Sequence, residues 1–185
     1  MKMLREFIQE NCILKGNFAL SGGGASDIYF DMKRALLDSD FINALIAEYR
    51  DRLCPYKNAI TVIGGCGMGA ALLVPLLLLG GKYEHAPLNG MIVRDPKRYG
   101  TKNIIEGRLP GQQRISVVDD VLTTGNSINI ACSAFKDAGY MIKDVFVLIN
   151  RANNETINSI YQKYKVPITS LFHASEFEPT KERND

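Results

Sequence analysis

The stretch Ile115–Ile128, ISVVDDVLTTGNSI, decides the expected fold. Its first part, Ile115–Val118, is a largely β-branched and apolar run, which is typical of a strand covered on both faces. Two acids, Asp119 and Asp120, follow where that strand is expected to end, and open α/β sheets bind ligands at this edge. The loop Thr123–Ser127 then leads into an apolar helical pattern. We therefore expect a strand, a ligand-binding turn and a helix.

The turn has the chemistry of a phosphate site. It offers backbone N–H groups, three hydroxyls and a helix N-terminus, all of which suit a phosphate. Because the two carboxylates would repel a phosphate, we expect them to bind the hydroxyls of a sugar while the loop holds its phosphate. One alternative is an ordinary strand–turn–helix with solvated acids. Another is a Walker B strand, which requires a G-x-x-x-x-G-K-S/T sequence that the chain does not contain.

The segment VVDDVLTTGNS, residues 117–127, resembles the phosphoribosyl-pyrophosphate (PRPP) motif of type I phosphoribosyltransferases. That motif has four apolar residues, two acids, two further apolar residues and a Thr/Gly/Ser loop. Strands alternate with helical patterns along the chain, which favours an α/β fold with a mostly parallel central sheet flanked by helices. The resemblance implies the type I phosphoribosyltransferase fold with a small N-terminal hood. We expect a single domain over residues 1–177, with the hood at about 1–35, and a polar tail at 178–185.

Composition limits the partners. With 22 Lys and Arg against 20 Asp and Glu, the net charge is +2, and the charges are mixed along the chain, so nothing favours nucleic acid. The four cysteines are widely spaced and only two histidines occur, which argues against zinc and for reduced thiols in a cytoplasm. The most apolar run, Ala70–Leu79, is too short to span a bilayer. We expect a cytoplasmic protein without a membrane or nucleic-acid partner.

Residues 17–31, NFALSGGGASDIYFD, contain three consecutive glycines that predict a turn between two short strands. The segment is either a plain hairpin or a place where the backbone approaches a ligand closely. It resembles the F-x-L-x-S-G-x-x-S-x-x-Y-F entrance of orotate phosphoribosyltransferases, although Gly24 and Ala25 stand where that family often has basic residues. The resemblance implies a hood over the base, with Ser21, Tyr29 and Phe30 at orotate. The matching residues are Phe18, Leu20, Gly23, Ser26, Tyr29 and Phe30.

A glycine-rich segment follows the expected strand Ala59–Ile63 and precedes an apolar helix that Pro75 should kink or shorten. Residues 65–70, GCGMGA, fit the dinucleotide fingerprint G-x-G-x-x-A, but the acid expected about 20 residues on is not convincing, because Glu84 precedes the next apolar strand. In a phosphoribosyltransferase the same position is the pyrophosphate loop. Since Met68 stands where some members carry lysine, the loop would act through its backbone. The resemblance places four residues at PRPP here, Gly64, Gly65, Cys66 and Gly67.

The basic segment Arg94–Lys102 follows the expected strand Met91–Val93. It is either a solvated loop or a lid that carries cations to a pyrophosphate. It resembles the family's catalytic loop V-R-K-x-x-K-x-H-G-T with one residue deleted and Tyr99 at the histidine position. The resemblance implies catalytic roles for Arg94 and Lys97 and PRPP contacts for Arg98 and Tyr99. It also implies a homodimer with shared active sites, because in that family the loop reaches the site of the neighbouring subunit.

The other elements follow from periodicity. An opening helix should end near Gly16, Asp38 should cap a helix that ends near Leu53, and a helix from Ile128 should end at Gly139. The strand Val145–Ile149 runs directly toward Arg151. We expect a last helix at 155–164 and a last strand at 168–172. The resemblance pairs Arg151 with the orotate carboxylate, which suits a planar guanidinium fork.

The resemblance implies transfer of the phosphoribosyl group from PRPP to orotate, giving orotidine 5′-monophosphate and pyrophosphate in pyrimidine nucleotide biosynthesis. Mg²⁺ would be held mainly through PRPP. The alternatives are a phosphoribosyltransferase for a purine or another base and a PRPP-binding regulator with little turnover. The expected catalytic residues are Asp120, Lys97 and Arg94. The expected PRPP-binding residues are Asp119, Asp120, Thr123, Thr124, Gly125, Asn126, Ser127, Gly64, Gly65, Cys66, Gly67, Arg94, Lys97, Arg98 and Tyr99. The expected orotate-binding residues are Arg151, Thr123, Ser21, Tyr29 and Phe30.

Overall fold

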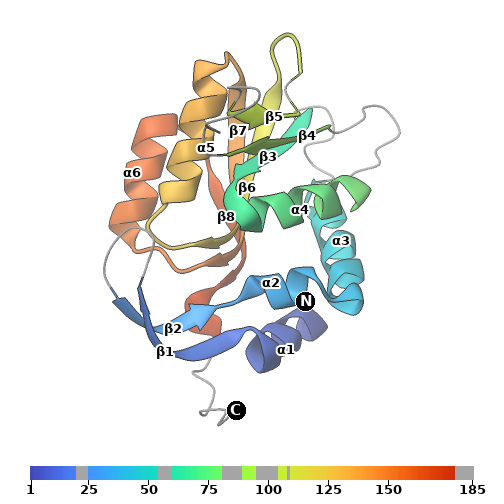
Figure 1. Ribbon diagram of the computed structural model, residues 1–185, viewed down its shortest axis with the longest axis vertical. Helices are drawn as coiled ribbons and strands as arrows, with labels where there is room; N and C mark the ends of the chain where they lie inside the picture. Colours follow the sequence, from blue (N-terminus) through green and yellow to red (C-terminus); the bar gives the residue numbers. More distant parts are fainter. Residues whose placement is uncertain (20–24, 54–59, 81–88, 95–103, 108, 178–185) are drawn as a thin grey trace.

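The computed structural model is an α/β fold built on a six-stranded sheet (Figure 1). It describes residues 1–19, 25–53, 60–80, 89–94, 104–107 and 109–177. The strand order is β5-β4-β3-β6-β7-β8, and of these strands only β5 runs antiparallel to its neighbour. The expected α/β class with a mostly parallel sheet is therefore confirmed. The strands are β3 Val62–Cys66, β4 Asn89–Val93, β5 Ile105–Glu106, β6 Arg114–Leu122, β7 Met141–Asn150 and β8 Ile168–His173.

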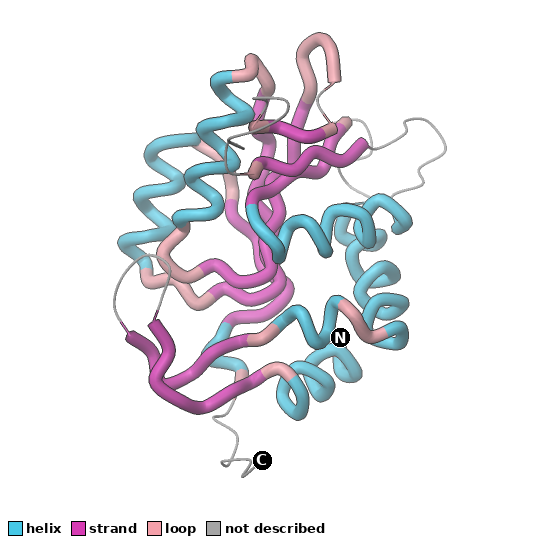
Figure 2. The backbone as a smooth tube through the Cα atoms, viewed as in Figure 1, coloured by secondary structure: helices cyan, strands magenta, loops and turns pink. Residues whose placement is uncertain are grey.

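The central strand β6 is covered on both faces, as expected. Val117 packs in one hydrophobic cluster with helices α5 (Asn126–Asp137) and α6 (Asn154–Tyr164). Val118 packs in the other cluster with α1 (Lys2–Asn11), α3 (Ser39–Leu53) and α4 (Gly67–Gly80). Figure 2 shows these helices on the two sides of the strands. Successive side chains of a strand point to opposite faces, so one apolar run supplies both clusters.

The expected end of this strand before the two acids is wrong. The parallel ladder between β6 and β7 continues through both, pairing Asp119 with Val147 and Leu122 with Asn150. Pairing with a buried neighbour therefore overrides the low strand preference of two aspartates.

The strand expected at Ala59–Ile63 is also displaced, because β3 begins at Val62 and includes Gly64 and Gly65. A Cβ on Gly64 would lie 2.6 Å from the Phe135 ring, and one on Gly65 would lie 2.2 Å from the Val118 carbonyl oxygen. Close packing of strand and helices thus explains these two glycines. The apolar helix α4 runs unbroken through Pro75, so the predicted shortening is wrong.

The N-terminal segments form a separate layer at the lower end of Figure 1. Helix α1 ends at Asn11, five residues before the expected Gly16, because β1 (Ile13–Ala19) begins there and pairs antiparallel with β2 (Ala25–Phe30). The predicted pair of short strands is confirmed, whereas the glycine turn lies outside the described residues. A short helix α2, Met32–Leu36, follows.

The remaining predicted elements are confirmed. An Asp38 carboxylate oxygen accepts hydrogen bonds from the N–H groups of Asp40 (3.1 Å) and Phe41 (2.9 Å), and so caps α3. Helices α5 and α6 and strands β7 and β8 lie at the expected positions, and a 3₁₀ turn at Ala174–Glu176 follows. Across the described residues, no helix combines the length and apolarity needed to cross a membrane.

The glycine at position 65 yields a stability prediction. Gly65→Ala should lower the free energy of unfolding by about 3 kcal/mol or more, because the new Cβ meets backbone and Ala70, which cannot rotate away. Urea denaturation followed by circular dichroism measures this. Gly111→Ala is the control, since Gly111 has φ +76° but nothing within 4 Å of an added Cβ, so its cost should stay near 1 kcal/mol. Equal losses in both variants would contradict the packing explanation.

Candidate active site

The site lies at the carboxyl ends of β3, β6 and β7, where a cavity of about 360 Å³ opens. Three parts of the chain supply its walls: the end of β2 with the start of α2, the junction of β3 with α4, and the segment from β6 into α5. Arg151, directly after β7, completes the lining. The other lining residues are Tyr29, Phe30, Lys33, Cys66, Gly69, Asp119, Asp120, Val121, Leu122, Thr123, Thr124, Gly125, Asn126, Ser127 and Ile128.

The two acids point to opposite faces of the sheet. A Cβ on Gly69 would lie 2.3 Å from Asp120 Oδ1, so this carboxylate lies against the first turn of α4. The hydrogen bond that links Asp119 to Ser127 places the other carboxylate beside the first turn of α5. Each acid thus faces the positive end of a different helix dipole.

Asp119 is only 6% exposed. Burial raises the pKa of its carboxyl well above the ordinary value, and the charge of Asp120 raises it further, while the hydrogen bond with Ser127 opposes the shift. The Asp120 N–H donates to Asp119 Oδ1 at 3.0 Å, which fixes one of the two oxygens. The second oxygen is suited to accept a hydrogen bond from a ligand hydroxyl.

The loop ends in an uncapped helix. Gly125 adopts the left-handed conformation with φ 74° at the N-cap of α5, and no side chain caps the helix. Asn126 and Ser127 therefore lie in the first helical turn instead of the loop. Without a side-chain cap, the first N–H groups of α5 are available for an anion. A Cβ on Gly125 would lie 2.8 Å from Ile160 Cδ1, so α6 packs closely beneath this turn.

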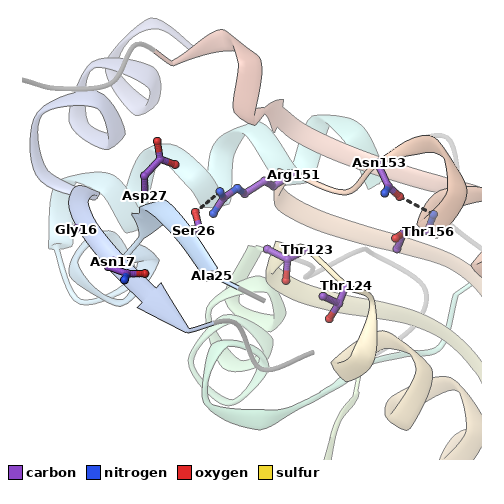
Figure 3. Close-up of a pocket in the computed structure, with 10 residues that line it drawn as sticks. All are labelled: Gly16, Asn17, Ala25, Ser26, Asp27, Thr123, Thr124, Arg151, Asn153 and Thr156. Carbon is purple, nitrogen blue, oxygen red and sulfur yellow. Dashed lines mark hydrogen bonds between the residues drawn. The ribbon is translucent and has the colours of Figure 1, made fainter. Parts of the chain in front are cut away.

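Arg151 joins the sheet to the N-terminal hairpin (Figure 3). Its Nη1 donates to the Ile28 carbonyl oxygen at 2.7 Å, and its Nη2 donates to Ser26 Oγ. A second, more open cavity of about 670 Å³ lies between the hairpin and Thr123 and Thr124, and Arg151 lines both cavities. The guanidinium therefore stands where the hairpin, β7 and the loop before α5 meet.

Other expected site residues are placed differently. Arg94, at the end of β4, is ion-paired with Glu106 and lines neither of the two cavities. Gly64 and Gly65 are buried inside β3, while Gly67 is exposed at the start of α4 with φ +83°. The expected contributors that lie outside the described residues are Ser21, Lys97, Arg98 and Tyr99.

Sequence reasoning did not assign Lys33 or Gly69 to the site, yet both line the cavity. The signal for Lys33 was its position three residues after Phe30, at the end of the segment expected to form the hood. Among the described residues, no group of three or more His, Cys, Asp or Glu side chains could hold a metal ion by itself.

Comparison with known proteins gives relatives along nearly the whole chain, although no family model matches. The orotate phosphoribosyltransferase of Methanothermobacter thermautotrophicus is 33% identical over 178 residues, covering 94% of this chain and 92% of the relative. That of Methanocaldococcus jannaschii is 30% identical over 184 residues, covering 97% of each chain. The solved structure of orotate phosphoribosyltransferase from Aeropyrum pernix superposes with a TM-score of 0.75 at 25% identity, covering 94% of this chain and 96% of that one.

The sheet order, the acidic strand end and the uncapped helix define a type I phosphoribosyltransferase. The alternative that the β3–α4 junction binds a dinucleotide is therefore rejected. With relatives of this identity over nearly its full length, the chain belongs to the orotate phosphoribosyltransferase family.

Burial of Asp119 yields a prediction on pH and stability. Since its folded pKa lies above the unfolded value near 3.8, the folded state binds more protons, and the free energy of unfolding falls as the pH rises from 3.8 through the raised pKa. Asp119→Asn should therefore be more stable than the wild type at pH 7, and the difference should shrink toward pH 3.8. Urea denaturation of both proteins from pH 4 to pH 7 measures this. A variant that is less stable at pH 7 would contradict the argument.

Proposed function

We propose that this protein transfers the 5-phosphoribosyl group from PRPP to orotate, giving orotidine 5′-monophosphate and pyrophosphate. This is a step of pyrimidine nucleotide biosynthesis. The observation that carries the proposal is one cavity that combines the two acids of β6, the uncapped start of α5 and Arg151. These three features match a sugar, its phosphate and a carboxylate-bearing base.

The ribose binds at the end of β6, and its 5′-phosphate binds at the start of α5. Asp119 and Asp120 accept hydrogen bonds from the ribose hydroxyls, which is the polar partner that a buried carboxylate needs. The backbone N–H groups and hydroxyls of Thr123–Ser127 bind the 5′-phosphate at the positive end of α5. The pyrophosphate then lies toward the start of α4, where Gly67 leaves backbone N–H groups accessible.

The reaction is a displacement at the anomeric carbon. A ring nitrogen of orotate forms the new C–N bond, the C–O bond to pyrophosphate breaks, and its electron pair leaves with pyrophosphate. The nitrogen loses its proton, for which Asp120 is the proposed acceptor. Catalysis comes from positioning and from stabilising the leaving group. Lys97 and Arg98 stay predicted contributors at the pyrophosphate, and so does Arg94, which in this structure is paired with Glu106.

Mg²⁺ would be held mainly through PRPP and pyrophosphate. It is usually bound by one or two carboxylates together with substrate phosphates and water, and the half-buried Asp120, which lies against the first turn of α4, presents carboxylate oxygens on that side. When bound, it would neutralise charge on the pyrophosphate.

Arg151 is the proposed partner of the orotate carboxylate. A guanidinium has five N–H donors, and the hairpin contacts at Ser26 and Ile28 take two of them. The remaining donors can bind two carboxylate oxygens in the fork geometry. Tyr29 and Phe30 line the same cavity and supply aromatic surface for the planar base.

The proposal also covers the surroundings of the enzyme. Residues 1–177 act as one domain, and the cytoplasm is the proposed location. Cys12 and Cys132 are buried and carry free thiols, and such thiols persist in a reducing compartment.

A turnover assay tests the function. With PRPP, Mg²⁺ and orotate, the loss of orotate absorbance should show product formation, and Arg151→Ala should lower kcat/KM about a hundredfold, since two charge-assisted hydrogen bonds are lost. Ser26→Ala is the matched control. It removes one hairpin contact but keeps the guanidinium, so its effect should stay below about tenfold.

Other outcomes would favour the alternatives. Turnover of guanine or hypoxanthine but not orotate would establish a purine enzyme. Binding of PRPP without turnover of any base would establish a regulator. Equal losses in Arg151→Ala and Ser26→Ala would show that Arg151 acts only by anchoring the hairpin.

The homodimer is proposed to form through α4. This helix is apolar all round, and an exposed apolar stripe of Met68, Ala71, Pro75 and Leu79 runs along it. A helix of this kind is normally covered on every side. Since α4 begins at the candidate site, a second copy seated on the stripe would lie next to that site, as shared active sites require.

Leu79→Glu tests this interface. Leu79 is 63% exposed, so a charge is tolerated in the monomer but opposed in a dimer, and we expect the mass measured by light scattering to fall from dimer to monomer. If the basic segment Arg94–Lys102 contributes to the active site of the neighbouring subunit, loss of the dimer should also lower turnover. Leu37→Glu is the control, because Leu37 is 72% exposed but follows α2. A dimer that survives Leu79→Glu would place the interface elsewhere.

A further inference from the structure

Lys33 is a cation in the cavity that the proposed mechanism does not use. It lies in the short helix α2, directly after the hairpin, and its side chain lines the cavity together with Gly69 and Asp120. The two cations among the described residues that line this cavity are Lys33 and Arg151. Since Arg151 is the proposed partner of the orotate carboxylate, Lys33 is the cation of this cavity that has no ligand group assigned to it.

The ammonium of Lys33 is held in place. It donates to the Tyr29 hydroxyl at 3.0 Å and lies 3.2 Å from Asp31 Oδ1. It also lies 5.3 Å from the centre of the Tyr29 ring, and that ring packs on Phe18. An ammonium has three N–H donors, so these two partners leave one for a ligand. The side chain remains 39% exposed, which leaves room for a ligand to reach it.

The group formed by Asp31, Lys33 and Arg34 is positive on balance. Asp31 is shared between Lys33 and Arg34, whose Nε lies 3.4 Å from Asp31 Oδ2. One carboxylate between two cations leaves an excess of one positive charge. Burial alone would lower the pKa of Lys33, but the hydrogen bond with Tyr29 and the ion pair with Asp31 outweigh it and raise the pKa, so the ammonium stays charged at neutral pH.

The position of α2 determines which part of the substrate lies near the Lys33 ammonium. Helix α2 packs against α4, and Figure 1 shows the two helices side by side. At the start of α4 the chain runs Gly67-Met68-Gly69, so this turn offers backbone N–H groups but no cation. The Asp120 carboxylate lies against the same turn and would repel a pyrophosphate. A cation beside α4 offsets that repulsion.

We propose that Lys33 binds the pyrophosphate group of PRPP, and the pyrophosphate product, through its ammonium. The identity of the ligand rests on the proposed function. Lys33 supplies from α2 the cation that Met68 cannot supply from α4. Tyr29 and Asp31 orient it.

Calorimetric binding of two probes tests this proposal. In the presence of Mg²⁺, Lys33→Gln should weaken pyrophosphate binding tenfold to about a hundredfold, the usual range for one lost hydrogen bond between charged groups. Binding of orotidine 5′-monophosphate, which has no pyrophosphate, should change less than about twofold. Lys33→Arg should restore much of the pyrophosphate affinity. Arg34→Gln is the matched control: it removes an equal charge one residue on, shares Asp31 and does not line the cavity.

A second measurement needs no variant. Mild acetylation of the wild type, read by mass spectrometry, should label Lys33 less when pyrophosphate is bound, while labelling of the exposed Lys136 stays unchanged. Absence of protection would overturn the proposal. So would equal losses of pyrophosphate and nucleotide binding in Lys33→Gln, or equal losses in Lys33→Gln and Arg34→Gln. If the wild type binds pyrophosphate through Lys33 but does not turn over orotate, the proposed base is wrong and the Lys33 site stands.

Discussion

The parallel ladder between β6 and β7 is the constraint on which the candidate site depends. Because it continues past the apolar core to Leu122, it carries Asp119 and Asp120 to the edge of the sheet and directs them to opposite faces. The same ladder ends where the Arg151 N–H donates to the Leu122 carbonyl oxygen at 2.9 Å. One run of backbone hydrogen bonds therefore sets the separation between the acids and the arginine, and the helices α4 and α5 pack around that spacing.

The adjacent acids Asp119 and Asp120 destabilise the folded protein locally. A buried carboxyl next to a second carboxylate is unfavourable, and the raised pKa of Asp119 records this. The surrounding packing offsets the cost, since both faces of β6 lie in extensive hydrophobic clusters. The protein thus keeps one buried acid, Asp119, beside the half-buried Asp120 at the place proposed for the sugar hydroxyls. Carboxyl groups with a strongly shifted pKa are common at binding and catalytic sites, where they serve the ligand and not the stability of the fold.

Much of the fold could be predicted from local patterns, because apolar strands that alternate with amphipathic helices leave clear signals. The β6–α5 unit and the place of Arg151 after β7 are examples. Contacts between distant segments could not be predicted in this way. Gly64 is explained by Phe135, 71 residues away in sequence, and the use of Arg94 by its ion pair with Glu106 on β5. Lys33 lines the cavity directly after a hairpin that is hydrogen-bonded to Arg151, a contact between segments far apart in the sequence.

The contact between Gly69 and Asp120 has a consequence for how sequences of this kind can diverge. No side chain fits at position 69 without displacing the Asp120 carboxylate, and Met68, at 67% exposure, points largely into solvent. A cation therefore cannot be placed at position 69, whereas the charge of the pocket can be changed on α2, where Lys33 lies, without disturbing this packing.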